Sequence, residues 1–374
     1  MRRALLCLVA LLPLLAGCWD QQAIEQLGFV AMVLVDGVPG SLHVTYRVVV
    51  PSQLPSSTNP GSPNSTTVVA GSGRDLAQAT RQANLASSKR LYMGQIQAVL
   101  LSERFARAGG AAGAMDFFVR GTRTRNISWV LVVPDDQIQA VMSLAPANAA
   151  YPAEAITDMD LNQREQGEVP SIRIFQFINQ IVGAGRDAAA PLLRAGRRSY
   201  RFAGVALFRQ GRLVANLSPQ QAEDFALLVR RSRQPSVAIP CNKTGTISAE
   251  LQNPHRQLSA LVHQGRLTTL KVRLRAVLHV DEATLCPINF TDRGQERAMR
   301  TAAAGIVMRR MEAALGRLQR VRSDPLGFGE VVRATDPTVW DAVQSDWHEV
   351  FARLPIRVEV QLTPDDSGLL NGTV

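Results

Sequence analysis

The residues that could carry chemistry on their own are few in this chain of 374 residues. It contains four cysteines and five histidines, and the histidines never fall at the spacing of metal ligands: His43, His255, His263, His279 and His348. No G-x-S-x-G, H-E-x-x-H, C-x-x-C, Walker A or complete G-x-G-x-x-G motif is present. The sequence therefore predicts no catalytic residue, no metal site and no soluble cofactor. A catalytic group assembled from distant residues would leave no such signature.

Cys18 ends a segment that is typical of exported proteins. Residues 1–3 (MRR) are positively charged, and residues 4–15 are apolar and interrupted only by Pro13. This run is too short to span a bilayer as a helix, which needs roughly 20 residues, but it matches the apolar region of a signal peptide. Residues 15–18 (LAGC) are similar to the lipobox of bacterial lipoproteins, in which the cysteine receives diacylglycerol and becomes the new N-terminus. We expect residues 1–17 to be a signal peptide and Cys18 to be the lipid attachment site, with an ordinary signal peptide as the alternative.

Cys241 and Cys286 are the cysteines that remain in the mature chain besides Cys18. A pair of cysteines in an exported protein often forms a disulfide. Both residues lie near the ends of predicted strands in the same part of the chain. A disulfide between them is therefore conceivable, and two independent thiols are the open alternative.

The composition fits a globular, basic protein of two or three domains. Hydrophobic residues make up 46% of the chain and charged residues 19%, which argues against wholesale disorder. The net charge is +10, from 41 Lys and Arg against 31 Asp and Glu. A basic surface suits anionic lipid headgroups, and the export signal argues against nucleic acid as the partner. An Arg-rich proteome explains the charge equally well.

The first half of the chain alternates predicted strands with predicted helices. Apolar runs predict strands at residues 27–35, 42–50, 96–101 and 127–133, and a helix is predicted to begin after Asp75. This alternation predicts an α/β domain with a mixed sheet.

Three segments of this half carry weaker signals. Residues 51–73 are rich in Pro, Ser and Gly and predict a loop, and residues 151–170 predict an irregular segment. Residues 183–197 are the best candidate for a domain boundary. A helix before it is expected to bury one apolar stripe, made of Ile172, Phe175, Ile178 and Val182.

The second half begins with a predicted hairpin and a helix that starts at Ser218, followed by strands at residues 245–251 and 257–263. Residues 270–280 alternate apolar side chains with basic ones, so this strand is expected to give one basic sheet face, made of Lys271, Arg273, Arg275 and His279. A long helix is predicted over residues 295–320. A second helix from Pro337 carries five apolar residues at helical spacing: Val339, Trp340, Val343, Trp347 and Phe351. His348 is expected on its solvated face.

Four blocks of sequence, taken together, resemble the Ger(x)C family, the lipoprotein C subunits of the nutrient germinant receptors of bacterial spores. They are residues 17–29 (GCWDQQAIEQLGF), residues 87–103 (SSKRLYMGQIQAVLLSE), residues 204–219 (GVALFRQGRLVANLSP), and residues 324–329 (DPLGFG) with Trp340 and Trp347 after them. They occur in the order of the family and span nearly the whole chain. The resemblance implies a mixed α/β fold of three parts, which we expect at residues 18–195, 196–240 and 241–374.

The resemblance also implies a function. It predicts a lipid-anchored, non-enzymatic subunit on the extracytoplasmic face of the spore inner membrane, assembled with two membrane subunits of the receptor. The resemblance does not settle the task of this subunit, and the sequence suits a rigid scaffold for those partners. No cofactor is expected other than the lipid on Cys18, no metal or nucleic acid is expected, and no residue is assigned to ligand binding. The alternative is a lipid-anchored extracytoplasmic solute-binding protein, which would need a polar cleft between domains.

Overall fold

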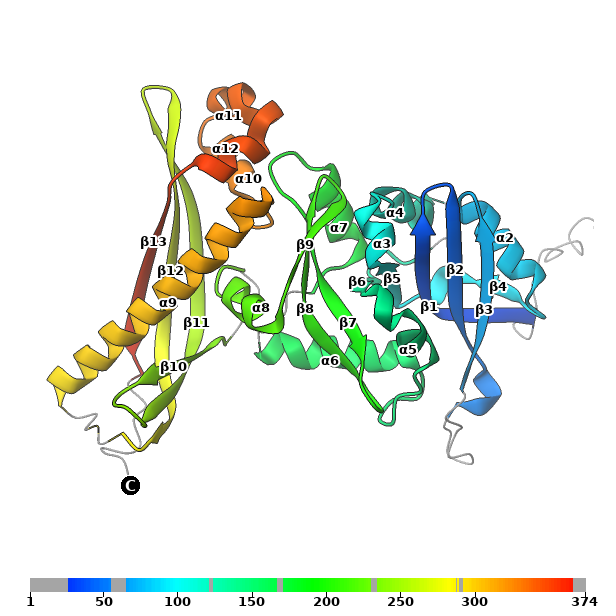
Figure 1. The fold of residues 1–374 in the computed structure, drawn as a ribbon, viewed down its shortest axis with the longest axis horizontal. Helices are drawn as coiled ribbons and strands as arrows, with labels where there is room; N and C mark the ends of the chain where they lie inside the picture. The colour runs from blue at the N-terminus through cyan, green and yellow to red at the C-terminus, as the bar shows by residue number, and fades with distance from the viewer. Residues whose placement is uncertain are drawn as a thin grey trace, which may run out of the picture.

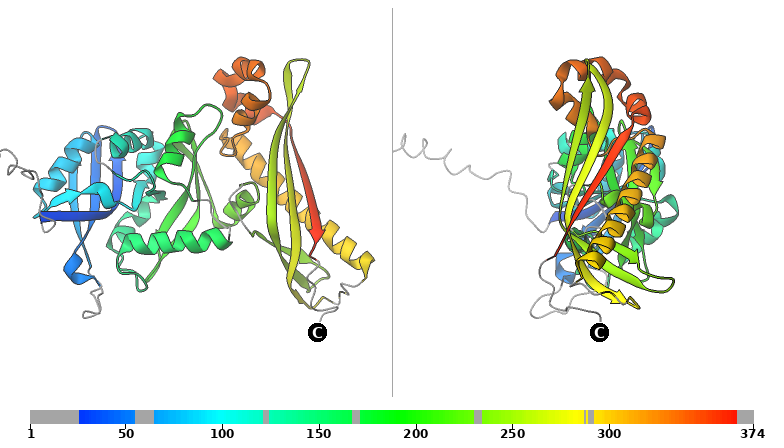
Figure 2. Two further views of the ribbon diagram at one scale, coloured as in Figure 1. Left: turned by 180° about the vertical axis from the view of Figure 1, so that it is seen from behind. Right: turned by 90° about the vertical axis from the view of Figure 1, so that its left-hand side faces the viewer.

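The computed structural model describes residues 26–54, 65–120, 124–166, 171–229, 234–286, 288 and 292–365. The molecule is elongated, and two β-sheets follow one another along its long axis (Figure 1). The first sheet, with its helices, lies at one end, and the second sheet, with one long helix, lies at the other, as the view from behind also shows (Figure 2). The predicted mixed α/β fold is confirmed.

The first sheet has nine strands, in the order β3-β2-β1-β5-β6-β7-β8-β9, with β4 paired to β1 outside this path. They are β1 (Leu27–Val38), β2 (Ser41–Val49), β3 (Thr66–Gly73), β4 (Arg90–Tyr92), β5 (Ala98–Ser102), β6 (Trp129–Val133), β7 (Ala189–Ala195), β8 (Tyr200–Arg209) and β9 (Arg212–Leu217). The central strands β1, β5, β6 and β7 are parallel, and antiparallel strands flank them on each side. The parallel strands are mostly apolar because both faces of the sheet are covered.

Helices cover the two faces of the first sheet in separate sets. On one face lie α2 (Leu76–Leu85), α3 (Glu103–Arg107), α4 (Ala111–Arg120) and α7 (Ile174–Val182), and on the other lie α5 (Ile138–Ser143) and α6 (Pro152–Gln166). Successive side chains of a strand point to opposite faces, so Val33 packs under the first set and Leu34 under the second. Helix α8 (Pro219–Ala226) follows β9 and leads toward the second sheet.

The second sheet has four strands, β10 (Ser236–Pro240), β11 (Thr246–His263), β12 (Arg266–Thr284) and β13 (Ile356–Pro364). Helix α9 (Arg293–Val321) lies across one face (Figure 2), and α10 (Phe328–Thr335), α11 (Pro337–Val343) and α12 (Trp347–Arg353) follow it. The inward positions that the sequence predicts on β12 are all buried: Leu270, Val272, Leu274, Ala276 and Leu278. Of the predicted basic face, Lys271 and Arg273 share Glu359 of β13 as an ion-pair partner.

Two segments predicted to be irregular contain regular elements among their described residues. Thr66–Gly73 forms β3 at the edge of the sheet, because its glycines allow α2 to approach; a Cβ on Gly71 would lie 2.2 Å from the carbonyl oxygen of Ala79. Residues 152–166 form α6, in which only a narrow stripe is apolar, including the fully buried Ala153 and Ile156. Composition alone predicts an irregular segment in both cases, but contacts with residues distant in sequence decide the local structure.

One further expectation needs correction. The stripe predicted to be buried on α7 points outward at Phe175 and Val182, which are 43% and 77% exposed, whereas Ile174 and Phe177 face the core. The segment predicted as a domain boundary, residues 183–197, contains β7, which pairs with both β6 and β8. Because sheet pairing continues through it, this segment is part of the first sheet. The division at residues 195 and 196 falls in the turn between β7 and β8 and stays a prediction.

Candidate functional site

Two chain segments that are far apart in sequence meet between the two sheets. Residues 183–188 lead into β7, and residues 323–330 connect α9 with α10. Asp187 N donates a hydrogen bond to the carbonyl of Asp324 (2.9 Å), and Glu330 N donates one to the carbonyl of Gly185 (3.2 Å). We call this region the junction, and define it by Gly185, Asp187, Ser323, Asp324, Gly329, Trp347 and His348.

The carboxylate of Asp324 is completely buried at the junction. Its Oδ1 accepts a hydrogen bond from Gly327 N (3.0 Å), and its Oδ2 accepts hydrogen bonds from Gly329 N (3.0 Å) and Trp347 Nε1 (3.1 Å). Burial raises the pKa of Asp324 to about 6, because desolvation outweighs these donors, and the negative charge of Asp187 raises it further. The block at residues 324–329 is thus a turn in which later backbone N–H groups donate to the side chain of its first residue, Asp324.

The side chain of Asp187 joins three parts of the molecule. Its Oδ2 accepts a hydrogen bond from Asp324 N (2.8 Å), and its Oδ1 accepts one from Gln210 N in the turn between β8 and β9 (3.1 Å). His348 Nε2, on α12, lies 3.1 Å from Oδ2. The prediction that His348 lies on a solvated helix face is therefore wrong. Asp187, which lies 161 residues earlier in the sequence, packs against His348, and the side chain of His348 is only 24% exposed.

Two glycines bring the backbones at the junction into direct contact. A Cβ on Gly329 would lie 2.4 Å from the Cα of Gly185 and 2.9 Å from the ring of Trp340. Gly185 itself has φ +89°, a conformation that other residues rarely adopt. Beside this contact Arg186 and Glu330 form an ion pair (3.5 Å). The close approach explains why both positions are glycine.

Both tryptophans of the C-terminal block pack in the core behind the junction. Trp340 and Trp347 are each 3% exposed, and their rings meet edge to face with centroids 5.5 Å apart. Their predicted core role is confirmed. The single helix predicted from Pro337 is broken by a 3-10 turn at Gln344–Asp346, which separates α11 from α12 and turns His348 toward Asp187.

The junction holds an Asp–His pair, and the hydroxyl of Ser323 at the same junction is already engaged elsewhere. Such a pair activates a nucleophile only when a hydroxyl or thiol lies within hydrogen-bond reach of the histidine. The hydroxyl of Ser323 is fully buried and donates its hydrogen bond to the carbonyl of Phe208 (2.6 Å). Over the described ranges, no three His, Cys, Asp or Glu side chains gather so that they could hold a metal ion. The arrangement is suited to fixing the two sheets relative to one another.

The raised pKa of Asp324 predicts a pH dependence of stability. The folded protein keeps this proton up to about pH 6, whereas the unfolded chain releases it near the ordinary value of 3.8. The stabilisation is therefore complete below about pH 3.8 and is lost as the pH rises through 6, a change of about 3 kcal/mol.

Urea unfolding of the protein and of Asp324→Asn at about pH 4 and about pH 7.5 checks this prediction. Asp187 and His348 are present in both proteins, so a pH dependence that differs between the proteins comes from Asp324 and its interaction with Asp187. We expect Asp324→Asn to lower the free energy of unfolding by more at the lower pH than at the higher pH. A difference that does not change with pH would contradict the raised pKa.

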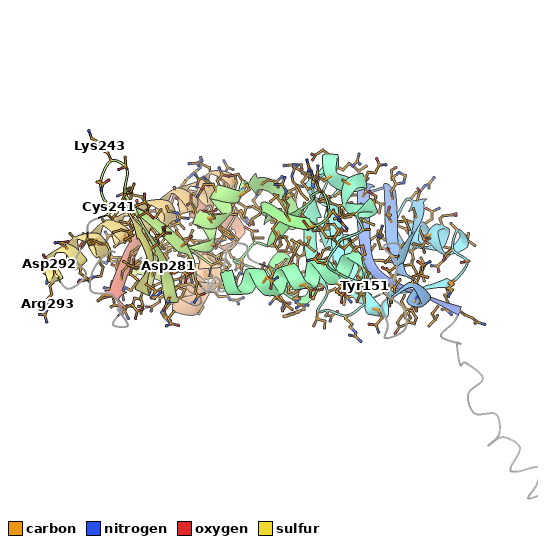
Figure 3. All side chains as sticks on the ribbon, turned by 90° about the horizontal axis from the view of Figure 1, so that it is seen from below. Tyr151, Cys241, Lys243, Asp281, Asp292 and Arg293 are labelled. Carbon is orange, nitrogen blue, oxygen red and sulfur yellow. A yellow bond between two sulfur atoms is a disulfide. The ribbon has the colours of Figure 1, made fainter. Side chains whose placement is uncertain are left out.

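The cysteines of the predicted disulfide lie away from the junction (Figure 3). Cys18 and residues 1–17 are outside the described residues. Cys241 and Cys286 form a disulfide in the structure, with Cα atoms 6.0 Å apart, and it joins the end of β10 to the segment after β12. Figure 3 shows Cys241 near the end of the molecule that is farther from the first sheet. None of the helices in the described ranges is long and apolar enough to cross a membrane.

The sequence could have pointed to only part of the junction. The block at residues 324–329, together with the tryptophans after it, already stood out as a unit. Asp187 carries no local signal, because it lies inside the segment 183–197, whose composition predicts a domain boundary. Its role depends on contacts with three distant segments, and a single sequence contains no record of them.

Comparisons with known proteins cover almost the whole chain. Residues 20–195 match the sequence model of the spore germination protein N-terminal domain, and residues 203–368 match the model described as spore germination B3/GerAC like, C-terminal. Among curated proteins of Bacillus subtilis (strain 168), spore germination protein KC is 19% identical over 98% of this chain and 97% of its own length. Spore germination protein B3 is 20% identical over 92% of each chain.

A solved structure supports the fold. The crystal structure of the GerBC protein superimposes with a TM-score of 0.58 at 15% sequence identity, and the match covers 91% of this chain and 99% of that chain. At this identity the likeness shows a shared fold. The two sheets and the helices between them therefore form an arrangement that is similar in both proteins.

Proposed function

The chain belongs to the Ger(x)C family of spore germination proteins, and from this membership we propose that it is a lipid-anchored, non-enzymatic subunit of a spore nutrient germinant receptor. In this proposal it scaffolds the two membrane subunits of the receptor and is required for the response to nutrients. It acts from the extracytoplasmic face of the spore inner membrane.

The observation that carries the proposal is the match of both family models, one after the other, over residues 20–195 and 203–368. The curated relatives, which include spore germination protein KC and spore germination protein GerQC of Bacillus cereus, cover the chain from end to end rather than one domain of it. A whole-length match of this kind supports a role in the same process. A chain that shared only one domain would support much less.

The junction supports a scaffold role. A scaffold must hold its binding surfaces at fixed positions, and the interlocked contacts of Asp187, Asp324, Gly185 and Gly329 hold the two sheets in one arrangement. The hydroxyl of Ser323 donates its hydrogen bond to the carbonyl of Phe208, so this side chain also ties the junction to the first sheet. Binding energy in such a protein comes from its surfaces, and its interior serves to position them.

The predicted lipid on Cys18 would confine the protein to the membrane that holds its partners. One acyl chain gives only marginal membrane binding, whereas the several chains of a bacterial lipoprotein hold stably. Confinement raises the effective concentration of the scaffold near the membrane subunits without any new protein contact. Cys18 therefore contributes to assembly through its lipid.

Deletion of the gene in the organism that makes this protein tests the proposal. We expect spores without it to lose their response to the nutrients that this receptor senses, while germination by a nutrient-independent trigger continues. Expression of the wild-type chain in trans should restore the response. A deletion strain that responds normally to every nutrient would contradict the proposed role.

A further inference from the structure

The first strand begins at one end of the long axis of the molecule (Figure 1). Nine residue steps separate Cys18 from Leu27, so even a fully extended chain between them spans only about 30 Å. A lipid on Cys18 therefore keeps the start of β1 near the bilayer. The surface beside the start of β1 is the part of the protein that such a lipid brings closest to the headgroups.

That surface is built by β4 and by the end of α2. Leu27 pairs with Arg90 of β4, and Asn84 Oδ1 near the end of α2 accepts a hydrogen bond from Leu91 N (3.0 Å). Both elements lie together at this end of the molecule in Figures 1 and 2. We call this surface the N-terminal tip, and define it by its exposed side chains Arg81, Leu85, Lys89, Arg90 and Tyr92.

The N-terminal tip is basic, and the described part of the chain does not neutralise it. Residues 76–97 include three cations and no Asp or Glu. None of Arg81, Lys89 and Arg90 forms an ion pair with a described residue, in contrast to Arg104, which pairs with Asp36 (2.7 Å) at the other end of β1. These three charges are free to meet a negatively charged partner.

The same surface exposes apolar side chains in a fixed position. Leu85 is 75% exposed and Tyr92 is 38% exposed. The ring of Tyr92 meets the ring of Phe29 edge to face, with centroids 5.8 Å apart, so β1 holds it in place. Cations around an exposed leucine and an amphipathic tyrosine are the combination that binds at the boundary between headgroups and acyl chains.

We propose that the N-terminal tip lies directly on the anionic phospholipid surface beside the lipid of Cys18, so that the long axis of the molecule points away from the membrane. The proposal rests on the lipid attachment proposed above. Each cation near an anionic leaflet strengthens binding roughly fivefold, so the three together contribute on the order of 100-fold. The lipid on Cys18 tethers the chain, and the tip fixes its orientation.

Another exposed apolar surface competes with the tip. Phe175 and Val182 on α7 are also exposed, and a chain lying on its side would place α7 against the bilayer instead. Leu85 and Val182 have nearly equal exposure, 75% and 77%, so a cysteine at either position is an equally accessible probe. The two positions therefore form a matched pair for deciding which surface meets the lipid.

The experiment uses the full chain, expressed with its signal segment and purified as the lipoprotein, carrying Leu85→Cys or Val182→Cys. Each variant is placed in phosphatidylcholine vesicles with or without phosphatidylglycerol, and labelling by a water-soluble maleimide is timed. The chain without an added cysteine is the blank, since Cys18 is expected to carry lipid and Cys241 pairs with Cys286. The mass of the purified protein reports the lipid separately.

We expect labelling at Leu85→Cys to slow about tenfold or more in the anionic vesicles, while labelling at Val182→Cys stays unchanged. Adding Arg81→Gln, Lys89→Gln and Arg90→Gln together should restore fast labelling although the lipid is still present. Equal rates at both positions on the lipidated protein, or protection of Val182→Cys instead, would overturn the docking proposal and leave lipid attachment intact. A mass without the lipid would overturn the attachment, and the docking proposal with it.

Discussion

Gly329→Ala is expected to lower the free energy of unfolding by about 3 kcal/mol, although alanine ordinarily favours a helix such as α10. The new Cβ would lie 2.4 Å from the Cα of Gly185 and 2.9 Å from the ring of Trp340. The obstructing atoms belong to backbone and to a buried ring, so neither can move away without separating residues 183–188 from residues 323–330. Urea unfolding followed by tryptophan fluorescence measures the loss.

Gly113→Ala is the matched control for this prediction. Gly113 is also in a helix, α4, but a Cβ there would meet no atom within 4 Å. The same substitution should raise the free energy of unfolding by about 0.5 to 1 kcal/mol, because alanine loses less backbone freedom on folding. If both variants were stabilised alike, the backbone contact at the junction would not be as close as the structure has it.

Asp324→Asn is expected to cost about 3 kcal/mol at neutral pH. The two carboxylate oxygens accept three hydrogen bonds, from Gly327 N, Gly329 N and Trp347 Nε1. Asparagine replaces one oxygen with an NH2 group that cannot accept, so at least one buried donor loses its partner and faces another donor. Equilibrium unfolding in urea checks the loss.

Asp292→Asn is the control for the second prediction. Asp292 also accepts hydrogen bonds from two backbone N–H groups, those of Gly294 and Gln295, but it is exposed at the N-terminus of α9. Asparagine caps helices about as well as aspartate, so this change should stay within about 0.5 kcal/mol. If both variants lost a similar free energy of unfolding, burial of Asp324 at the junction would not explain the effect of Asp324→Asn.

Local signals in the sequence predicted much of the fold. Asp75 caps α2 by accepting a hydrogen bond from Gln78 N, and Ser218 caps α8 by accepting one from Gln221 N, as expected from their positions. The alternation on β12 placed its buried side chains correctly. These features depend on residues within one turn or one strand, which a single sequence records.

The features that the sequence did not predict depend on contacts between distant segments. Strand β3 is rich in glycine, and its place in the sheet depends on β2 and on the close approach of α2. Asp187 and His348 are 161 residues apart in the sequence, and no local sequence pattern at either residue predicts their contact. The outward stripe of α7 was misassigned because the helix is apolar on more than one face, and only packing decides which face is covered.

A lipid-anchored subunit required for nutrient-triggered germination should depend on Cys18, so Cys18→Ala in the spore-forming organism is the decisive experiment. Lipid mass, retention in the spore membrane and the nutrient response are read on the same spores, with nutrient-independent germination as the control. We predict that all three are lost while nutrient-independent germination continues. A variant that still carries lipid, or one that is released from the membrane while the nutrient response is unchanged, would contradict the claim.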